Sequence, residues 1–110
     1  MLKFLCGALL ALGMVVGPFA RAESVLFLNP GTPVELFWTS YSQFMQAAAD
    51  DLHIDLRILY SNRTSEVVIA QAREALLGPP RPDSLVFVHA DSVAPAILPL
   101  AMVSGVKIII

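Results

Sequence analysis

Cysteine and charge are both scarce in this sequence. The one cysteine, Cys6, lies in the apolar stretch near the N-terminus, so the rest of the chain has neither a disulfide nor a thiol and depends on an apolar core for its stability. Charged side chains make up 15% of the 110 residues, and none of the basic ones gather into a patch. This distribution argues against nucleic acid as a partner.

Motifs of several enzyme classes are also missing. No GxGxxG follows the first apolar segment after the N-terminal stretch, and the sequence contains no P-loop and no GxSxG. These absences argue against dinucleotide binding, nucleotide phosphate binding and a serine-hydrolase elbow. The two histidines stand alone, and a lone histidine is weak evidence for a metal. The sequence therefore predicts no catalytic residues, no cofactor and no metal site.

The long uncharged run lies at the N-terminus. Lys3 precedes it, residues 4–20 carry no charge, and the letters ARA occupy positions 20–22. A basic start, an apolar run and an A-x-A site are typical of a secretory signal peptide. The run is shorter than the about 20 residues that span a bilayer, which argues against a membrane anchor. We expect a cleavable signal at 1–22, cut after Ala22, and export to the periplasm.

The remainder, residues 23–110, alternates between short apolar segments and segments of helical periodicity. Apolar strands that alternate with helices imply a parallel sheet with right-handed crossovers. The expected fold class is therefore α/β, a doubly wound parallel half-lobe in the order β-α-β-α-β-α-β. Because the last expected strand ends the sequence, we expect residues 23–110 to be the N-terminal part of a longer lobe. The expected strands cover 24–28, 54–60, 84–88 and 106–110, and the expected helices 32–52, 65–77 and 93–104.

The first expected helix carries both a start signal and an apolar stripe. Thr32 is expected to cap the helix, with Pro33 at the first helical position and Glu35 completing a capping box. An apolar stripe then runs along one side of the helix and predicts a face buried in the core. Its members are Phe37, Tyr41, Phe44, Ala48 and Leu52.

Candidate binding residues follow the expected strands, because ligands of open parallel sheets sit outside the carboxyl ends of the strands. Asn29 is either a hydrogen-bond partner for a ligand or a residue that shapes the turn. Phe37 reads as core by its periodicity, whereas Trp38 lies off the stripe and offers either filler or a flat face for stacking. His89 is either a structural histidine or a ligand contact. Asp91 either caps the third helix or accepts hydrogen bonds from hydroxyl groups.

Several segments together resemble the periplasmic sugar-binding proteins of ABC transporters, which have the type I periplasmic binding fold. They are "VLFLNPG", the aromatic pair "FW" with the following "SYSQFMQAAADDL", "DSLVFVHADSVAP" and "GVKIII". The resemblance implies a two-lobed protein that holds its ligand between the lobes, with this chain forming part of the first lobe. It implies that Phe37 and Trp38 stack on a sugar, and that His89 or Asp91 binds hydroxyl groups.

The function expected from these features is that of a solute receptor without enzymatic activity. It would capture a small polar, sugar-like ligand in the periplasm and deliver it to the membrane permease of an ABC transporter. A ligand sensor that feeds a membrane kinase is an alternative within the same family. An exported, hydrolase-like α/β enzyme and a receiver-like interaction domain are alternatives outside it. The export signal and the absence of an acidic cluster after the first strand argue against the receiver domain.

Overall fold

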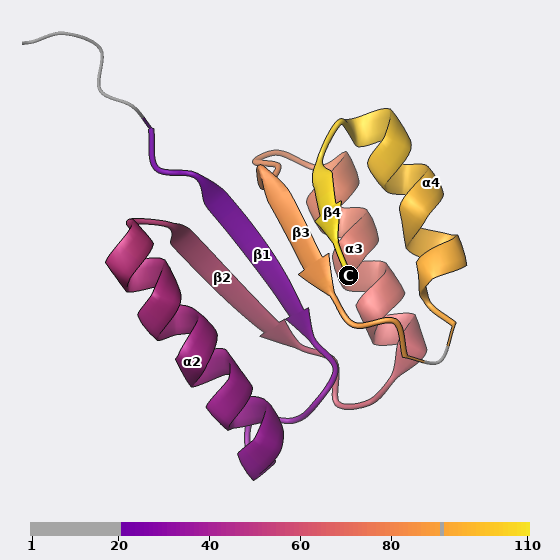
Figure 1. Cartoon of the computed structure of the whole chain (residues 1–110). Coiled ribbons are helices and arrows are strands. Elements are labelled where there is room, and N and C mark those ends of the chain that lie inside the picture. The colour runs from indigo at the N-terminus through magenta and orange to yellow at the C-terminus, as the bar shows by residue number, and fades with distance from the viewer. Residues whose placement is uncertain (1–20, 91) are drawn as a thin grey trace, which may run out of the picture.

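The computed structural model describes residues 21–90 and 92–110, so most of the expected signal peptide lies outside the described residues. No helix in the described part is long and apolar enough to cross a membrane. Strands and helices alternate along this part as the sequence predicted (Figure 1). The elements are β1 (Ser24–Asn29), α2 (Leu36–Leu52), β2 (Asp55–Tyr60), α3 (Ser65–Leu77), β3 (Ser84–Phe87), α4 (Ala94–Ser104) and β4 (Lys107–Ile109).

The strands form one parallel sheet in the order β2-β1-β3-β4. The central strand β1 aligns Leu26 with Arg57 of β2 on one side and with Leu85 of β3 on the other. It tolerates this position because its residues are apolar on both faces: Leu26 and Phe27 are both buried. β2 lies at the sheet edge, where Asp55 and Arg57 reach solvent. The expected α/β class with a parallel doubly wound sheet is confirmed.

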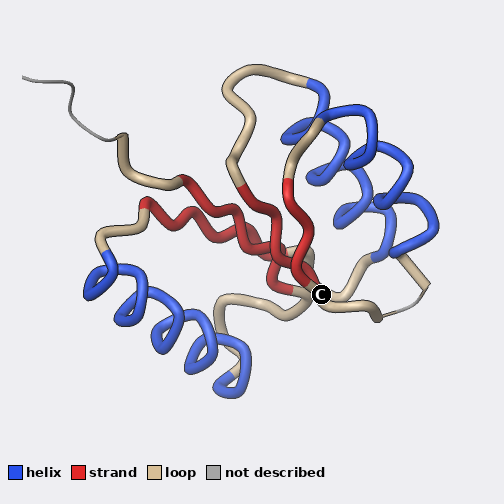
Figure 2. Tube along the Cα trace, turned by 45° about the horizontal axis from the view of Figure 1, so that its top comes forward, coloured by secondary structure: helices blue, strands red, loops and turns tan. Residues whose placement is uncertain are grey.

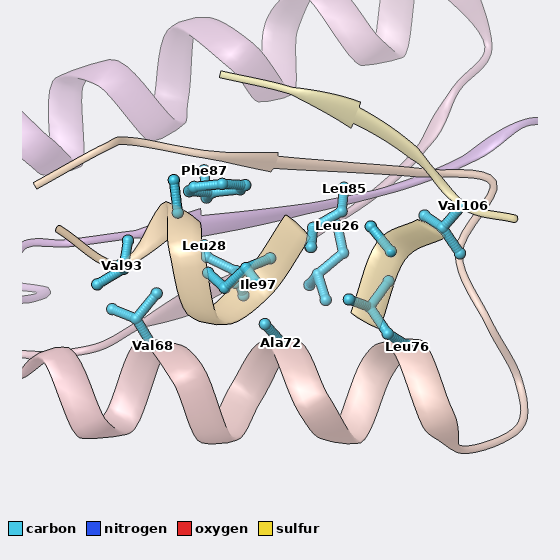
Figure 3. Close-up of a cluster of buried hydrophobic side chains, with 12 residues drawn as sticks. Leu26, Leu28, Val68, Ala72, Leu76, Leu85, Phe87, Val93, Ile97 and Val106 are labelled. Atoms are coloured by element: carbon cyan, nitrogen blue, oxygen red, sulfur yellow. The ribbon is translucent and has the colours of Figure 1, made fainter. Parts of the chain in front are cut away.

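Helices cover the two faces of the sheet unequally. α3 and α4 lie together on one face, and α2 lies alone on the other (Figures 1 and 2). The main core fills the space between the sheet and the α3–α4 pair (Figure 3). Apolar side chains from strands and helices meet there with their surfaces excluded from water, which is the chief stabilising contribution. Its most buried members are Leu28, Ala72, Leu76, Leu85, Phe87 and Ile97.

The apolar stripe of α2 departs from the prediction of a buried face. Phe37 is 67% exposed, Phe44 78% and Leu52 68%. The residues of α2 that are buried are Ser42 and Ala49, which lie beside the stripe. A lone helix can cover only part of a sheet face, and no second described helix lies beside α2 to cover its outer side. The prediction that this stripe is core is therefore wrong within the described residues.

The start of α2 also differs from the expected capping box. The helix begins at Leu36, with Glu35 as its N-cap residue, and residues 32–35 form a turn closed by a hydrogen bond from Glu35 N to Thr32 O. One of the two hydrogen bonds of a capping box is present, because Thr32 N donates to Glu35 Oε1 at 3.1 Å. The Thr32 hydroxyl is buried without a hydrogen-bond partner among the described residues. Pro33 introduces the turn and precedes the helix.

Asp83 ties the amino ends of three strands together. Its Oδ2 accepts a hydrogen bond from Ser24 N at 2.8 Å, and its own backbone N–H donates to Ser24 O at 2.9 Å. Lys107 N donates to Asp83 O at 3.2 Å, and the Arg21 guanidinium lies 2.8 Å from Asp83 Oδ1. The hydrogen bond from Ser24, followed by the Arg21 guanidinium, lowers the pKa of the Asp83 carboxyl.

We expect Asp83→Asn to reduce the acid sensitivity of the fold. A carboxyl whose pKa is lowered on folding contributes stability above its unfolded value, about pH 4, and this stability is lost as the pH falls through the folded value. The melting temperature of the parent chain should therefore fall more steeply below about pH 4 than that of the variant. Circular dichroism melts between pH 3 and pH 7 measure this, with exposed Asp51→Asn as the control. Parallel profiles for parent and variant would contradict the assignment.

Candidate functional site

The loops that leave the carboxyl ends of β1, β2 and β3 gather at one edge of the sheet, together with the first turn of α2 (Figure 1). Their described residues are 29–35, 61–64, 88–90 and 92–93. Helices begin there and strands end there, so backbone N–H groups and polar side chains are available to a ligand. We call this region the carboxyl edge.

Asn29 holds the first of these loops from within the protein. It is 0% exposed. Its Nδ2 donates to Trp38 O at 2.9 Å and to Ser42 Oγ at 2.8 Å, and its Oδ1 accepts from Gly31 N at 2.9 Å. The side chain thus joins the end of β1 to the first turns of α2. The sequence left two interpretations of Asn29 open. This geometry supports the interpretation that Asn29 shapes the turn, because no surface of Asn29 faces solvent.

Trp38 lies on the turn that Asn29 shapes. A Cβ atom added to Gly31 would stand 2.3 Å from Trp38 Cδ1 and 2.5 Å from Trp38 Cβ, so the indole rests directly on the glycine backbone. Phe37 contacts the indole edge to face, with ring centroids 4.9 Å apart, and Tyr41 contacts it at 5.9 Å. The indole is half-buried among aromatic rings rather than deep among aliphatic side chains. Part of the residue stays accessible to solvent.

Phe37 extends the aromatic surface away from the protein. At 67% exposure it is the more accessible member of the pair, against the core position that its periodicity predicted. Its ring also lies 6.3 Å from that of Tyr41. Aromatic rings held edge to face are mutually stabilised by about 0.5–1.5 kcal/mol. The residues Phe37, Trp38 and Tyr41 are called the aromatic surface below.

The first two loops of the carboxyl edge are joined by consecutive backbone hydrogen bonds. Ser61 N donates to Asn29 O at 3.0 Å, Asn62 N to Gly31 O at 3.0 Å and Arg63 N to Pro30 O at 2.8 Å. These bonds continue the pairing of β1 with β2 beyond the last residues of both strands. The loop after β2 therefore fixes the position of the loop after β1, on which the indole rests.

An ion pair between Glu35 and Arg63 joins the same two loops and was not among the residues predicted from the sequence. Arg63 Nε lies 3.1 Å from Glu35 Oε1 and 3.2 Å from Oε2, and its Nη2 also bonds to Oε2. This guanidinium, chiefly through its hydrogen bonds, lowers the pKa of the Glu35 carboxyl. The sequence held half of the signal, since Glu35 was identified as a capping residue, but nothing in the spacing indicated a partner 28 residues later.

The remaining two candidates, His89 and Asp91, follow β3 in the sequence. β3 ends at Phe87, and His89 is exposed in the loop that follows it. Its Nδ1 accepts a 3.4 Å hydrogen bond from Ala94 N at the start of α4. Asp91 lies outside the described residues. Because α4 and α2 cover opposite faces of the sheet (Figure 2), the start of α4, to which His89 is hydrogen-bonded, lies across the sheet from α2, which carries Trp38.

The larger hollows of the described surface lie away from the carboxyl edge. A hollow of about 220 Å³, lined by Arg57, Pro80 and Arg81 among others, lies near the amino ends of the strands. A small one of about 20 Å³ lies at the carboxyl edge between Ser61 and Ala90. We favour the carboxyl edge on physical grounds, because strand ends and helix starts converge there. In the described residues no group of three or more His, Cys, Asp or Glu side chains is placed to hold a metal ion.

Solved structures similar to this chain include two periplasmic binding proteins. A periplasmic sugar-binding protein from Pseudomonas fluorescens is 55% identical, with a TM-score of 0.74, over 77% of this chain and 26% of that chain. An ABC transporter periplasmic solute-binding protein from Actinobacillus succinogenes 130z, with bound D-allose, is 16% identical, with a TM-score of 0.64, over 80% of this chain and 30% of that chain. No family model and no curated protein matches the sequence. This chain therefore spans less than a third of either structural relative.

Proposed function

We propose that this chain, a relative of the periplasmic sugar-binding proteins over about a quarter of their length, forms part of a solute receptor that captures a sugar-like ligand. The observation that carries the proposal is the 55% identity to a periplasmic sugar-binding protein over 77% of the chain. The two structural relatives are binding proteins, which favours binding without turnover. The receptor would serve an ABC permease after export and cleavage behind Ala22.

The aromatic surface supplies the physical basis for binding. A pyranose presents C–H groups on one face and hydroxyl groups at its rim, so one flat aromatic ring and a few polar groups suffice to orient it. Trp38 offers the ring, which packs on Gly31 and is held in a T-shaped contact with Phe37. His89 is a candidate for the hydroxyl groups because it follows β3 at the same edge, and Asp91 is a second candidate from its place in the sequence. Closure of a second lobe over this surface would exclude water from the sugar.

A chimera tests the proposal. Residues 23–110 replace the matching segment of the Pseudomonas fluorescens protein, and binding to a panel of neutral sugars that includes D-allose is measured by calorimetry. We expect saturable binding of at least one sugar. Trp38→Ala should weaken that binding by about ten-fold, as expected for the loss of an aromatic contact of about 1.4 kcal/mol. Trp38→Phe should weaken it less, because a flat ring remains.

Leu77→Ala serves as the matched control, because Leu77 ends α3 near the opposite edge of the sheet and is 49% exposed. Its affinity should equal that of the parent chimera. A folded chimera that binds no sugar of the panel would overturn the proposed function. Equal losses of affinity in the Trp38 and Leu77 variants would show that the indole is not part of the binding site.

A further inference from the structure

We propose that Arg63 is a positioning residue for the aromatic surface and that it acts through Glu35. The proposal rests on the proposed function in one respect, that Trp38 contacts the ligand. The proposal does not require Arg63 itself to contact the ligand. Its role follows from a chain of contacts that runs from the loop after β2, through the turn before α2, to the indole.

The first link is the ion pair. Both oxygens of the Glu35 carboxylate accept hydrogen bonds from the Arg63 guanidinium. This geometry fixes the orientation of the two side chains as well as the distance between them. The Glu35 side chain is 27% exposed and that of Arg63 65% exposed, so the pair lies at the surface with its acidic partner the more protected. The two residues come from different loops, so the pair constrains where the turn before α2 lies relative to β2.

The second link joins Glu35 to the indole. Glu35 Oε1 also accepts the hydrogen bond from Thr32 N, and Glu35 O accepts the first helical hydrogen bond, from Thr39 N at 2.9 Å. The carboxylate therefore holds the turn, and the backbone of the same residue begins α2. Trp38 is the third residue of that helix. A shift of Glu35 must move the first turn of α2, and the indole moves with it.

The third observation is local backbone strain in the loop that presents Arg63. Asn62 and Arg63 have φ values of 53° and 57°, in the left-handed region that non-glycine residues seldom occupy. Each such residue costs on the order of 1 kcal/mol. The backbone bonds to Gly31 and Pro30 offset this cost and aim the Arg63 side chain across the loop toward Glu35. Strain held in this way is typical of segments that position a functional group.

Trp38 is the only tryptophan of the sequence, so its fluorescence reports on this chain of contacts without any ligand. The chain is compared with Glu35→Gln, Arg63→Ala, Arg63→Lys and the Glu35→Gln/Arg63→Ala double variant. Emission maximum and acrylamide quenching are measured after circular dichroism has verified folding. Glu35→Gln is the sharpest variant, because its amide oxygen still accepts from Thr32 N while the ion pair is lost.

An exposed ion pair shifts a conformational equilibrium by a factor of about two to five, so we expect a red-shifted and more readily quenched indole in both single variants. The double variant should add little to either single one, and Arg63→Lys should restore part of the signal. Asp83→Asn is the matched control, because it removes the ion pair at the opposite end of the sheet and should leave the indole signal unchanged.

Affinity in the chimera completes the test. Glu35→Gln should weaken sugar binding by about two- to five-fold while Asp83→Asn does not. Unchanged Trp38 fluorescence in folded Glu35→Gln would overturn the positioning role, whatever the chimera binds. If Arg63→Ala fails to fold, Glu35→Gln decides by the same readout. A changed indole signal in a chimera that binds no sugar would keep the positioning role and overturn the proposed function instead.

Discussion

Asn29→Ala should lower the free energy of unfolding by about 3 kcal/mol, because it removes a buried side chain with three hydrogen bonds and leaves the buried Gly31 N–H without its acceptor. A lost hydrogen bond costs about 1 kcal/mol and a stranded buried polar group about 1–3 kcal/mol. Urea unfolding followed by circular dichroism measures the change. The indole emission should shift as well, since the turn beneath Trp38 loses its internal support.

Ser42→Ala provides a graded control for this result. It removes one of the two acceptors of the Asn29 amide and leaves the bonds to Trp38 O and Gly31 N in place. We expect a loss of about 1 kcal/mol. Equal losses for both variants, or an Asn29→Ala variant within about 0.5 kcal/mol of the parent, would contradict the view that Asn29 organises the loop.

Gly31→Ala should destabilise the chain by about 2 kcal/mol, the usual cost of forcing a methyl group into a closely packed site. The added Cβ would stand 2.3–2.5 Å from three atoms of the Trp38 side chain, two of which, Cβ and Cγ, belong to its root rather than to a flexible end. The indole must therefore leave its position. The midpoint of urea unfolding and the Trp38 emission maximum should both change.

The double variant Gly31→Ala/Trp38→Gly distinguishes a clash with the Trp38 side chain from a backbone effect. Trp38→Ala would keep the Cβ atom that lies 2.5 Å from the added methyl group, whereas Trp38→Gly removes all three contacting atoms, so Gly31→Ala should cost less than about 0.5 kcal/mol in that background. The same cost in both backgrounds would place the strain in the loop itself. In the chimera, Gly31→Ala should reduce sugar affinity together with stability, as expected if the glycine seats the binding ring.

The fold could be predicted from the sequence because local and long-range signals agreed. The first three apolar strands end in turn residues, the first two helices carry a periodic apolar stripe, and the alternating order allows essentially one kind of sheet. α3 was expected at 65–77 and observed there. The stripe of α2 was the exception. Its periodicity was read correctly as an apolar face, but whether that face is covered depends on neighbouring elements, which periodicity does not specify.

The site could be predicted only in part. The position of Phe37 and Trp38 at the carboxyl edge follows from the strand-to-helix turn, and the structure places both there. The burial of Asn29 did not follow, because an Asn before Pro is compatible with both a turn and a contact surface. The pairing of Glu35 with Arg63 could not be found, since it depends on how two loops from neighbouring strands align in space.

The sheet order has a consequence for how the chain folds as it is synthesised. β1 comes first in the sequence yet stands in the middle of the sheet, between β2 and β3. Because synthesis starts at the N-terminus, β1 cannot pair fully with β3 until Phe87 has been synthesised. Such long-range pairing folds slowly. The topology itself thus delays the native state, which would favour the proposed export by keeping the polypeptide unfolded for longer.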